Sequence, residues 1–237
     1  MGKNYKRVLL KLSGEQLAGK FESGIDPQLA GWLAEEVNKV HKAGCQVVMV
    51  VGGGNMVRGA EVAGHGIKRV TADQMGMLSG LINSIALTDI FEAHKIPTRC
   101  LSNIFAEQVA ESFAHRLVEK HLVRGRVVVV AGGVGRPYFT HDTAAVSLAL
   151  ELGCEVVLKA TKVDGVYNKD PHLHKDAVLI SSIRHQKAVE DSAIKVMDKA
   201  ALGLALEHNM PIIIFDVLKE NNLLKIVNGE AVGTSVH

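Results

Sequence analysis

The chain is poor in the residues that staple small or extracellular proteins together. It has three cysteines among 237 residues, Cys45, Cys100 and Cys154, which lie about fifty positions apart and form no CxxC pair. Three thiols cannot all pair within one chain, and this spacing matches no zinc site. We therefore expect reduced cysteines, no metal held by protein ligands alone, and a cytoplasmic location.

Aromatic residues and long apolar runs are scarce as well. Aromatics make up 4% of the chain, although surfaces that bind single-stranded nucleic acids use aromatic rings to stack bases. The 27 basic and 25 acidic residues give a net charge of +2 and are scattered, whereas DNA-binding proteins cluster their basic residues. No apolar run approaches the roughly 18 residues that a membrane span needs. We expect neither nucleic acid nor membrane as a partner.

What the chain does contain is an alternation of two apolar patterns. Five Val- and Ile-rich runs are apolar almost throughout, as strands buried on both faces of a parallel sheet are; they cover residues 7–12, 46–51, 126–131, 155–160 and 211–215. Between them, apolar residues recur every three or four positions, which is typical of helices: Leu29, Leu33, Val37, Val40; Met75, Leu78, Ile82, Ile85; Val109, Phe113, Leu117; Ile194, Met197, Ala201, Leu204.

This alternation predicts an α/β protein, a three-layer αβα sandwich with a mainly parallel central sheet. The length suits a single domain over residues 1–237, with a soft boundary between two lobes near residues 124–125. Ligands of such sheets bind at the carboxyl ends of the strands. The loops that follow four of the runs are therefore where function is expected.

The first two of these loops carry glycines beside cationic side chains. Lys11 ends the first run and is followed by Ser13 and Gly14, so that its ammonium could reach a phosphate that the backbone also approaches. The stretch 14–20 imitates a P-loop, but Phe21 stands where a Ser or Thr should hold Mg²⁺, which excludes that interpretation. Three glycines, residues 52–54, follow the second run, and Arg58 lies within reach of an anion there.

The third and fourth loops combine glycines with charged residues. Residues 132–143 lead into a helix expected at 144–152, and Thr140 and Asp142 are candidate N-caps. Asp142 would repel a phosphate unless it orients a lysine or a metal. Residues 159–171 contain three lysines, an Asp-Gly turn and Tyr167, against which an adenine could lie. Together the four loops indicate a polyanionic nucleotide.

These loops, in this order, resemble the bacterial UMP kinases of the amino-acid-kinase superfamily. The similar segments are KLSGE (11–15), GID (24–26), VGGGNMVRG (51–59), RVTADQMGML (69–78), GRPYFTHDTAA (135–145), LKATKVDGVYNKDP (158–171), KVMD (195–198) and GEAVGT (229–234). The resemblance spans nearly the whole chain. It implies transfer of the γ-phosphoryl group from ATP to UMP, Mg²⁺ carried on the phosphates, and a homohexamer.

The resemblance also assigns roles to single residues. It implies Lys11, Arg58 and Asp142 as the catalytic set. The ATP site would comprise Lys11, Leu12, Ser13, Gly14, Gly54, Arg58, Thr161, Tyr167 and Asp170, and the UMP site Gly53, Asp73, Val134, Gly135, Arg136, Pro137, Tyr138, Phe139, Thr140 and His141. Residues 19–24 would lie where such enzymes respond to GTP, and UTP commonly inhibits them.

The chain departs from the family in the third loop. The family reads Thr-Gly-Asn-Pro-Phe-Phe-Thr-Thr-Asp, and this chain has Val134, Arg136, Tyr138 and His141 at the first, third, fifth and eighth positions. Val134 and His141 remove hydroxyls that could bind UMP, while Arg136, and His141 if protonated, would add positive charge. These changes bear on UMP affinity and on the response to GTP and UTP.

Two alternatives stay open at this point. A related kinase with a carboxylate acceptor would keep the ATP half, but it gives no reason for Asp73 within DxMGML. A non-catalytic nucleotide- or anion-binding relative should lack the charged set, whereas Lys11, Arg58 and Asp142 are all present.

Overall fold

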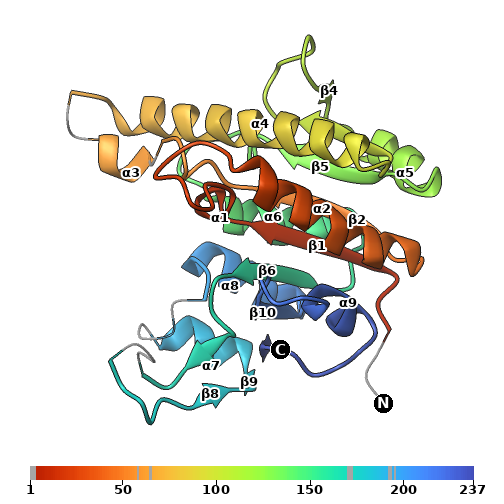
Figure 1. Cartoon of the computed structure of the whole chain (residues 1–237). Coiled ribbons are helices and arrows are strands. Elements are labelled where there is room, and N and C mark those ends of the chain that lie inside the picture. Colours follow the sequence, from red (N-terminus) through yellow and green to blue (C-terminus); the bar gives the residue numbers. More distant parts are fainter. Residues whose placement is uncertain (1–3, 58, 64–65, 170–172, 192–193, 195) are drawn as a thin grey trace.

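A nine-stranded sheet forms the middle layer of the molecule (Figure 1). The computed structural model describes residues 4–57, 59–63, 66–169, 173–191, 194 and 196–237. The strand order is β4-β3-β5-β2-β1-β6-β10-β11-β9, and only the pair β10–β11 is antiparallel among the strands of this sheet. The predicted α/β sandwich with a mainly parallel sheet is confirmed.

The central strands coincide closely with the apolar runs of the sequence. They are β1 (Arg7–Leu12), β2 (Gln46–Val51), β5 (Val127–Ala131), β6 (Val157–Thr161) and β10 (Ile212–Asp216). Their side chains alternate between two cores: Leu10 and Met49 face one layer of helices, whereas Leu9 and Val48 face the other. Burial on both faces explains why these strands are apolar throughout.

The remaining strands were not predicted, because their sequence signals are weaker. Those of the main sheet are β3 (Thr98–Ser102), β4 (Glu111–Ser112), β9 (Ser182–Ile183) and β11 (Thr234–Val236), and a separate hairpin pairs β7 (Val166–Tyr167) with β8 (Leu179–Ile180). They are short or carry polar residues, so no continuous apolar run marks them. They extend the sheet outward from its apolar centre.

Helices cover both faces of the sheet. Helices α2 (Pro27–Lys42), α4 (Arg69–Ala93) and α9 (Asn222–Val227) pack on one face, and α5 (His115–Val123), α6 (His141–Glu151), α7 (His185–Glu190) and α8 (Lys199–His208) pack on the other. Two single turns, α1 (Gly14–Leu17) and α3 (Gly59–Val62), follow β1 and β2. None of the helices in the described parts of the chain is long and apolar enough to cross a membrane.

Three of the helical predictions need correction. Leu78 and Ile82 lie on a helix as expected, but they are 52% and 50% exposed, because α4 turns other residues, such as Leu81 and Leu87, toward the cores. The segment around Val109 and Phe113 is not helical, since β4 pairs there with β3 and α5 begins only at His115.

The third correction concerns the start of α8. Ile194 and Met197 were expected in the same helix as Ala201, but they precede it. Asp198 is the N-cap of α8 and accepts a hydrogen bond from the backbone N–H of Ala201 at 2.9 Å, so that the helix begins at Lys199.

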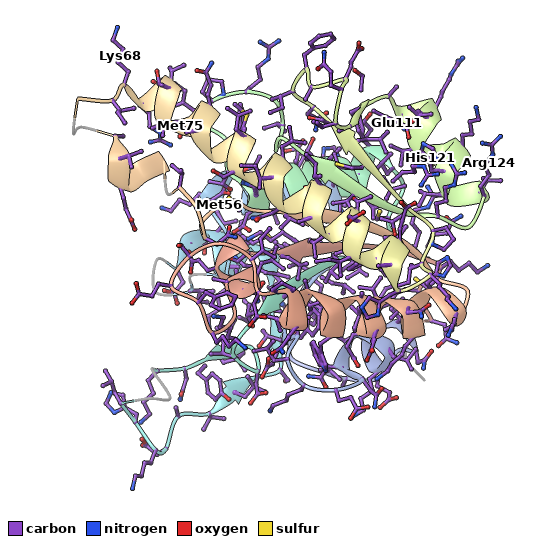
Figure 2. The ribbon with its side chains drawn as sticks, turned by 45° about the horizontal axis from the view of Figure 1, so that its top comes forward. Met56, Lys68, Met75, Glu111, His121 and Arg124 are labelled. Atoms are coloured by element: carbon purple, nitrogen blue, oxygen red, sulfur yellow. The ribbon has the colours of Figure 1, made fainter. Side chains whose placement is uncertain are left out.

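Figure 2 shows how side chains fill the space between the layers. Met56, Lys68 and Met75 lie toward the end of the molecule where α3 and α4 meet, and Glu111, His121 and Arg124 lie toward the opposite end. In Figure 1, β1 and β6 run toward the end of the molecule where α3 and α4 meet, so their carboxyl ends lie on that side. The four loops singled out in the sequence therefore share one edge of the sheet.

Candidate active site

A lysine–carboxylate–lysine cluster lies at this edge, where β1 and β6 run side by side. Lys11 and Lys159 are paired in register on the two parallel strands. Both ammonium groups contact the Asp142 carboxylate from α6: Lys11 Nζ lies 2.6 Å from Oδ1, and Lys159 Nζ lies 2.8 Å from Oδ2. The three side chains are 10%, 17% and 14% exposed, so solvent screens their charges only weakly.

The electrostatics of the cluster keep Asp142 ionised. Burial alone would raise the pKa of its carboxyl group, but the charges of Lys11 and Lys159 outweigh burial and lower it. Burial and the neighbouring Lys11 lower the pKa of the Lys159 ammonium against the attraction of Asp142. Lys11 and Lys159 thus share the carboxylate of Asp142, so this three-residue cluster itself carries a net positive charge that could attract a phosphate.

The start of α6 shows that Asp142 is not a helix cap. Thr140 is the N-cap, and its hydroxyl oxygen accepts hydrogen bonds from the N–H groups of Asp142 and Thr143 at 3.0 and 3.3 Å. The Asp142 carboxylate is left free to hold the two lysines. This geometry agrees with the expectation that Asp142 orients a lysine.

The predicted set of site residues did not include Lys159, although its loop was expected to contact the nucleotide, and it did not include Asp198. Lys159 also donates to the carbonyl of Val196. Asp198 accepts hydrogen bonds from the hydroxyls of Thr140 and Thr143, and so ties the beginning of α8 to the beginning of α6. A lysine inside a buried strand was the available signal for Lys159, and the KVMD motif was the signal for Asp198.

The glycines after β1 and β2 allow the backbones of two loops to touch. A Cβ on Gly14 would lie 2.5 Å from the carbonyl oxygen of Gly52 and 2.7 Å from the N of Gly54. A Cβ on Gly53 would lie 2.4 Å from the Cβ of Ser79 on α4. No larger residue fits either position, so the two glycine loops and α4 meet at van der Waals distance.

Beside the cluster opens a cavity of about 210 Å³. It is lined by Gly53, Gly54, Val57, Arg69, Asp73, Gly76, Met77, Gly133, Val134, Arg136, Phe139, Thr140 and His141. The cavity thus gathers most of the residues that the resemblance assigned to UMP. A second cavity, of about 310 Å³, touches Asp142 and Lys159 and extends between α6, α7 and α8.

Asp73 in the first cavity already has two partners. Arg69 Nε donates to its carboxylate oxygens at 2.8 and 2.9 Å, and the N–H of Tyr138 donates to Oδ2 at 2.8 Å. The Arg69 guanidinium also stacks over the Tyr138 ring, 5.4 Å from its centre. Since α4 begins at Arg69 and Asp73 lies in its second turn, Asp73 does not cap the helix.

His141 lies against three glycine positions, Gly52, Gly80 and Gly133. Burial, and then the charge of Lys11, lower the pKa of its imidazole to about 4, against an opposing effect of Asp142. Its Nε2 is buried and has no hydrogen-bond partner. The expectation that His141 could add positive charge is therefore wrong at neutral pH, because the ring is neutral there.

The other predicted residues divide into four groups. Gly135 and Pro137 belong to the loop beside the first cavity, whereas the Leu12 side chain lies in the core and Ser13 donates its N–H to Gln16 Oε1 at 2.8 Å. Thr161 lies at the end of β6, where its hydroxyl lies 2.6 Å from the carbonyl oxygen of Val163 and 2.9 Å from that of Phe215 and can donate to one of them. Tyr167 lies in β7. Arg58 and Asp170 lie outside the described residues.

An edge with two glycine loops, a preorganised cation pair and a carboxylate suits an enzyme that transfers phosphoryl groups, and comparison with known families agrees. The chain belongs to the amino acid kinase family, whose model matches residues 6–216.

Individual proteins that are similar to this chain carry more specific names than the family does. A uridylate kinase from Dichelobacter nodosus is 44% identical over 233 residues, which are 98% of this chain and 96% of that protein. The structure of UMP kinase from Bacillus anthracis superposes with a TM-score of 0.94 at 34% identity, covering 99% of this chain and 97% of the other. UMP kinase from Ureaplasma parvum gives 0.90 at 30% identity, with 99% of each chain covered.

Proposed function

We propose that this protein phosphorylates UMP with ATP and releases UDP and ADP, a step in the synthesis of pyrimidine nucleotides. The observation that carries the proposal is the mostly buried Asp142, held between Lys11 and Lys159 beside a cavity lined by the residues expected to bind UMP. Full-length similarity to uridylate kinases supports the same acceptor. We infer the reaction class from the site and the acceptor from the relatives.

The reaction needs alignment and positive charge more than it needs covalent help. An oxygen of the UMP phosphate attacks the γ-phosphorus of ATP, the new P–O bond forms, and the bond to the β-phosphate oxygen breaks in line with it. The attacking oxygen is already deprotonated at neutral pH, so no general base is required. Lys11 would stabilise charge on the transferring group, and Asp142 would fix the lysines in place.

We assign the nucleotides to the two sides of the cluster. Lys11, Leu12, Ser13, Gly14 and Gly54 would hold ATP phosphates, together with the predicted Arg58, and Thr161, Tyr167 and the predicted Asp170 would hold the nucleoside. UMP would occupy the cavity with Asp73, where the loop 134–141 covers it. The proposed lobe boundary near residues 124–125 would separate an acceptor and oligomerisation lobe from an ATP-nucleoside lobe.

Magnesium would arrive on the phosphates of ATP, where it neutralises charge on their oxygens. The carboxylates of Asp142 and Asp198 are already engaged, Asp142 by lysines and Asp198 by hydroxyls and the N–H of Ala201. Within the described residues, no three His, Cys, Asp or Glu side chains form a metal cluster. This donor set is compatible with a phosphate-borne ion.

We propose a homohexamer, and the surface of α4 supports self-association. Leu78 and Ile82 are exposed on this helix. The loop of residues 103–110 exposes Phe105 and Val109, whose side chains are 83% and 54% exposed. In the same loop, Ile104 and Ala106 pack against a small apolar cluster that includes Leu81 of α4. Apolar surface of this kind marks interaction sites. Light scattering at micromolar concentration should give a mass near six times 25.5 kDa; a monomer would contradict the proposal.

Control by GTP and UTP remains a prediction from the resemblance. A cytoplasmic location is likewise proposed, and the three buried, unpaired cysteines support a reducing compartment.

The experiment that tests the function is a panel of nucleoside monophosphates incubated with ATP-Mg. We expect UMP to be phosphorylated well and CMP poorly. A chain that phosphorylates a carboxylate substrate instead would favour the alternative within the family, and a chain that binds ATP without turnover would favour the non-catalytic alternative.

A further inference from the structure

A pair of buried asparagines lies behind the site without lining either of its two cavities. Asn55 follows the glycine loop after β2, and Asn83 lies in the middle of α4; they are 5% and 0% exposed. Their amides bond each other reciprocally: Asn55 Nδ2 donates to Asn83 Oδ1 at 3.0 Å, and Asn83 Nδ2 donates to Asn55 Oδ1 at 2.8 Å. Neither residue belongs to the charged cluster.

The remaining hydrogen bonds of the pair reach the loops that surround the site. Asn83 Nδ2 donates to the carbonyl of Gly52 at 2.7 Å, at the start of the triple glycine. Asn55 Nδ2 donates to the carbonyl of Gly24 at 2.6 Å, and the N–H of Gly24 returns a bond to the Asn55 carbonyl at 3.1 Å. Asn55 Oδ1 also lies so close to Gly14 that a Cβ there would be 2.5 Å away.

The pair therefore joins the two halves of the proposed reaction. On the donor side, the pair lies against Gly14 and bonds the carbonyl of Gly52, in the loop that carries Gly54. On the acceptor side, Asn83 belongs to α4, whose first turns carry Asp73, Gly76 and Met77 into the cavity. Because buried amides in a fully bonded network have one arrangement, a shift of α4 relative to the glycine loops would break several bonds at once.

We infer that Asn55 and Asn83 are positioning residues that fix the distance between donor and acceptor phosphates. The inference rests on the proposed phosphoryl transfer, which requires the reacting atoms within about 3–3.5 Å and in line. Since the pair touches neither cavity, its loss leaves each nucleotide bound but misaligned with the other. The signature is a fall in kcat with little change in either dissociation constant.

The test compares Asn83→Ala with the wild-type chain. Steady-state kinetics give kcat and both KM values, and calorimetry gives the separate affinities for ATP-Mg and for UMP. We expect kcat to fall by about 10–100-fold, because a displacement of about 1 Å can cost about 100-fold. Each dissociation constant should change by less than about threefold. The double variant Asn55→Ala/Asn83→Ala should be no slower than the slower single variant, since the two residues act as a unit.

Ser84→Ala is the matched control. Ser84 is the next residue of α4 and is equally buried, but its hydroxyl donates to the Gly80 carbonyl of its own helix. If Asn83→Ala folds poorly, Asn83→Ser serves instead, with assays run well below its unfolding midpoint by circular dichroism. A kcat that falls no further than in Ser84→Ala, or affinities that weaken while kcat holds, would overturn the inference.

This outcome is separable from that of the proposed function. The function fails if the wild-type chain does not phosphorylate UMP, whereas the inference fails on the comparison of variants. Should another monophosphate of the panel be the acceptor, the same comparison applies with that nucleotide.

Discussion

The charged cluster and the acceptor cavity are neighbours, yet they are built in different ways. Lys11, Lys159 and Asp142 project from two central strands and the first turn of a capped helix. The cavity is walled mainly by α4 and the loop between β5 and α6, in which Gly132, Gly133, Gly135 and Tyr138 all have positive φ. Regular structure fixes the groups for chemistry, and a loop shapes the recognition of the acceptor.

The departures from the family pattern fall on the recognition side of this comparison. Val134, Arg136 and Tyr138 lie in the loop, and His141 opens α6 beside it. Tyr138 has a φ of 69°, a conformation that costs a non-glycine residue about 1–2 kcal/mol. Its hydrogen bond to Asp73 and its stacking on Arg69 compensate for that cost. By the resemblance, the loop departs from the family pattern at these positions, whereas Lys11, Asp142 and Lys159 lie in segments that match it.

The sharpest way to test the comparison is to remove a charge from the cluster. Lys11→Met should lower kcat by about 10²–10³-fold, the typical effect of a preorganised charge aimed at the transferring group. Because Met keeps the apolar stem of a mostly buried side chain, the variant should stay folded by circular dichroism. A kcat near the wild-type value would remove Lys11 from the catalytic set.

Asp142→Asn tests the orienting role and should lower kcat by roughly 10–100-fold, with smaller changes in both KM values. The amide keeps the shape of the side chain but cannot balance two ammonium groups. Thr140, not Asp142, caps α6, so the helix should be retained. Unchanged kinetics would show that the lysines hold their positions without the carboxylate.

On the recognition side, Asp73 should govern the choice of sugar. If its carboxylate accepts a hydrogen bond from the 2′-hydroxyl, UMP should be preferred over deoxy-UMP by about 10–150-fold in kcat/KM, the equivalent of about 1.5–3 kcal/mol. Asp73→Ala should lower activity on UMP far more than on deoxy-UMP. Equal losses for the two nucleotides would point to a structural role through Arg69 and Tyr138 instead.

His141 gives the smallest expected effect, and it concerns stability. Its folded-state pKa of about 4 lies below the ordinary 6.5, so the unfolded chain binds the extra proton between these values. The contribution of the neutral ring to the free energy of unfolding is present above pH 6.5 and is lost as the pH falls toward 4. From pH 7 to pH 5, His141 should account for about 2 kcal/mol of lost unfolding free energy.

Urea denaturation at the two pH values measures this loss. His141→Thr, which carries the residue usual in the family, should lose correspondingly less stability between pH 7 and pH 5. Identical pH dependence in the two proteins would mean that His141 is solvated in the folded state.

Much of this architecture could be predicted from the sequence, and the failures have physical causes. The bounds of β1 and β2 were predicted because both faces of these strands are buried and their apolar runs are unbroken. Periodicity around Val109 and Phe113 misled because strand pairing overrode it. Lys159 was missed as a site residue because it becomes a neighbour of Lys11 only when β1 and β6 pair, which no local pattern records. The lobe boundary near residues 124–125 stays a prediction.

The pairing of β1 with β6 also has a consequence for how activity appears during folding. Lys11 comes from the first strand of the chain, whereas Asp142 and Lys159 come from its second half, and β1 lies between β2 and β6 in the sheet. Contacts between distant segments form late because long loops must close first. A nascent or partly refolded chain should therefore have no catalytic centre, and enzymatic activity would serve as a kinetic probe for completion of the whole sheet.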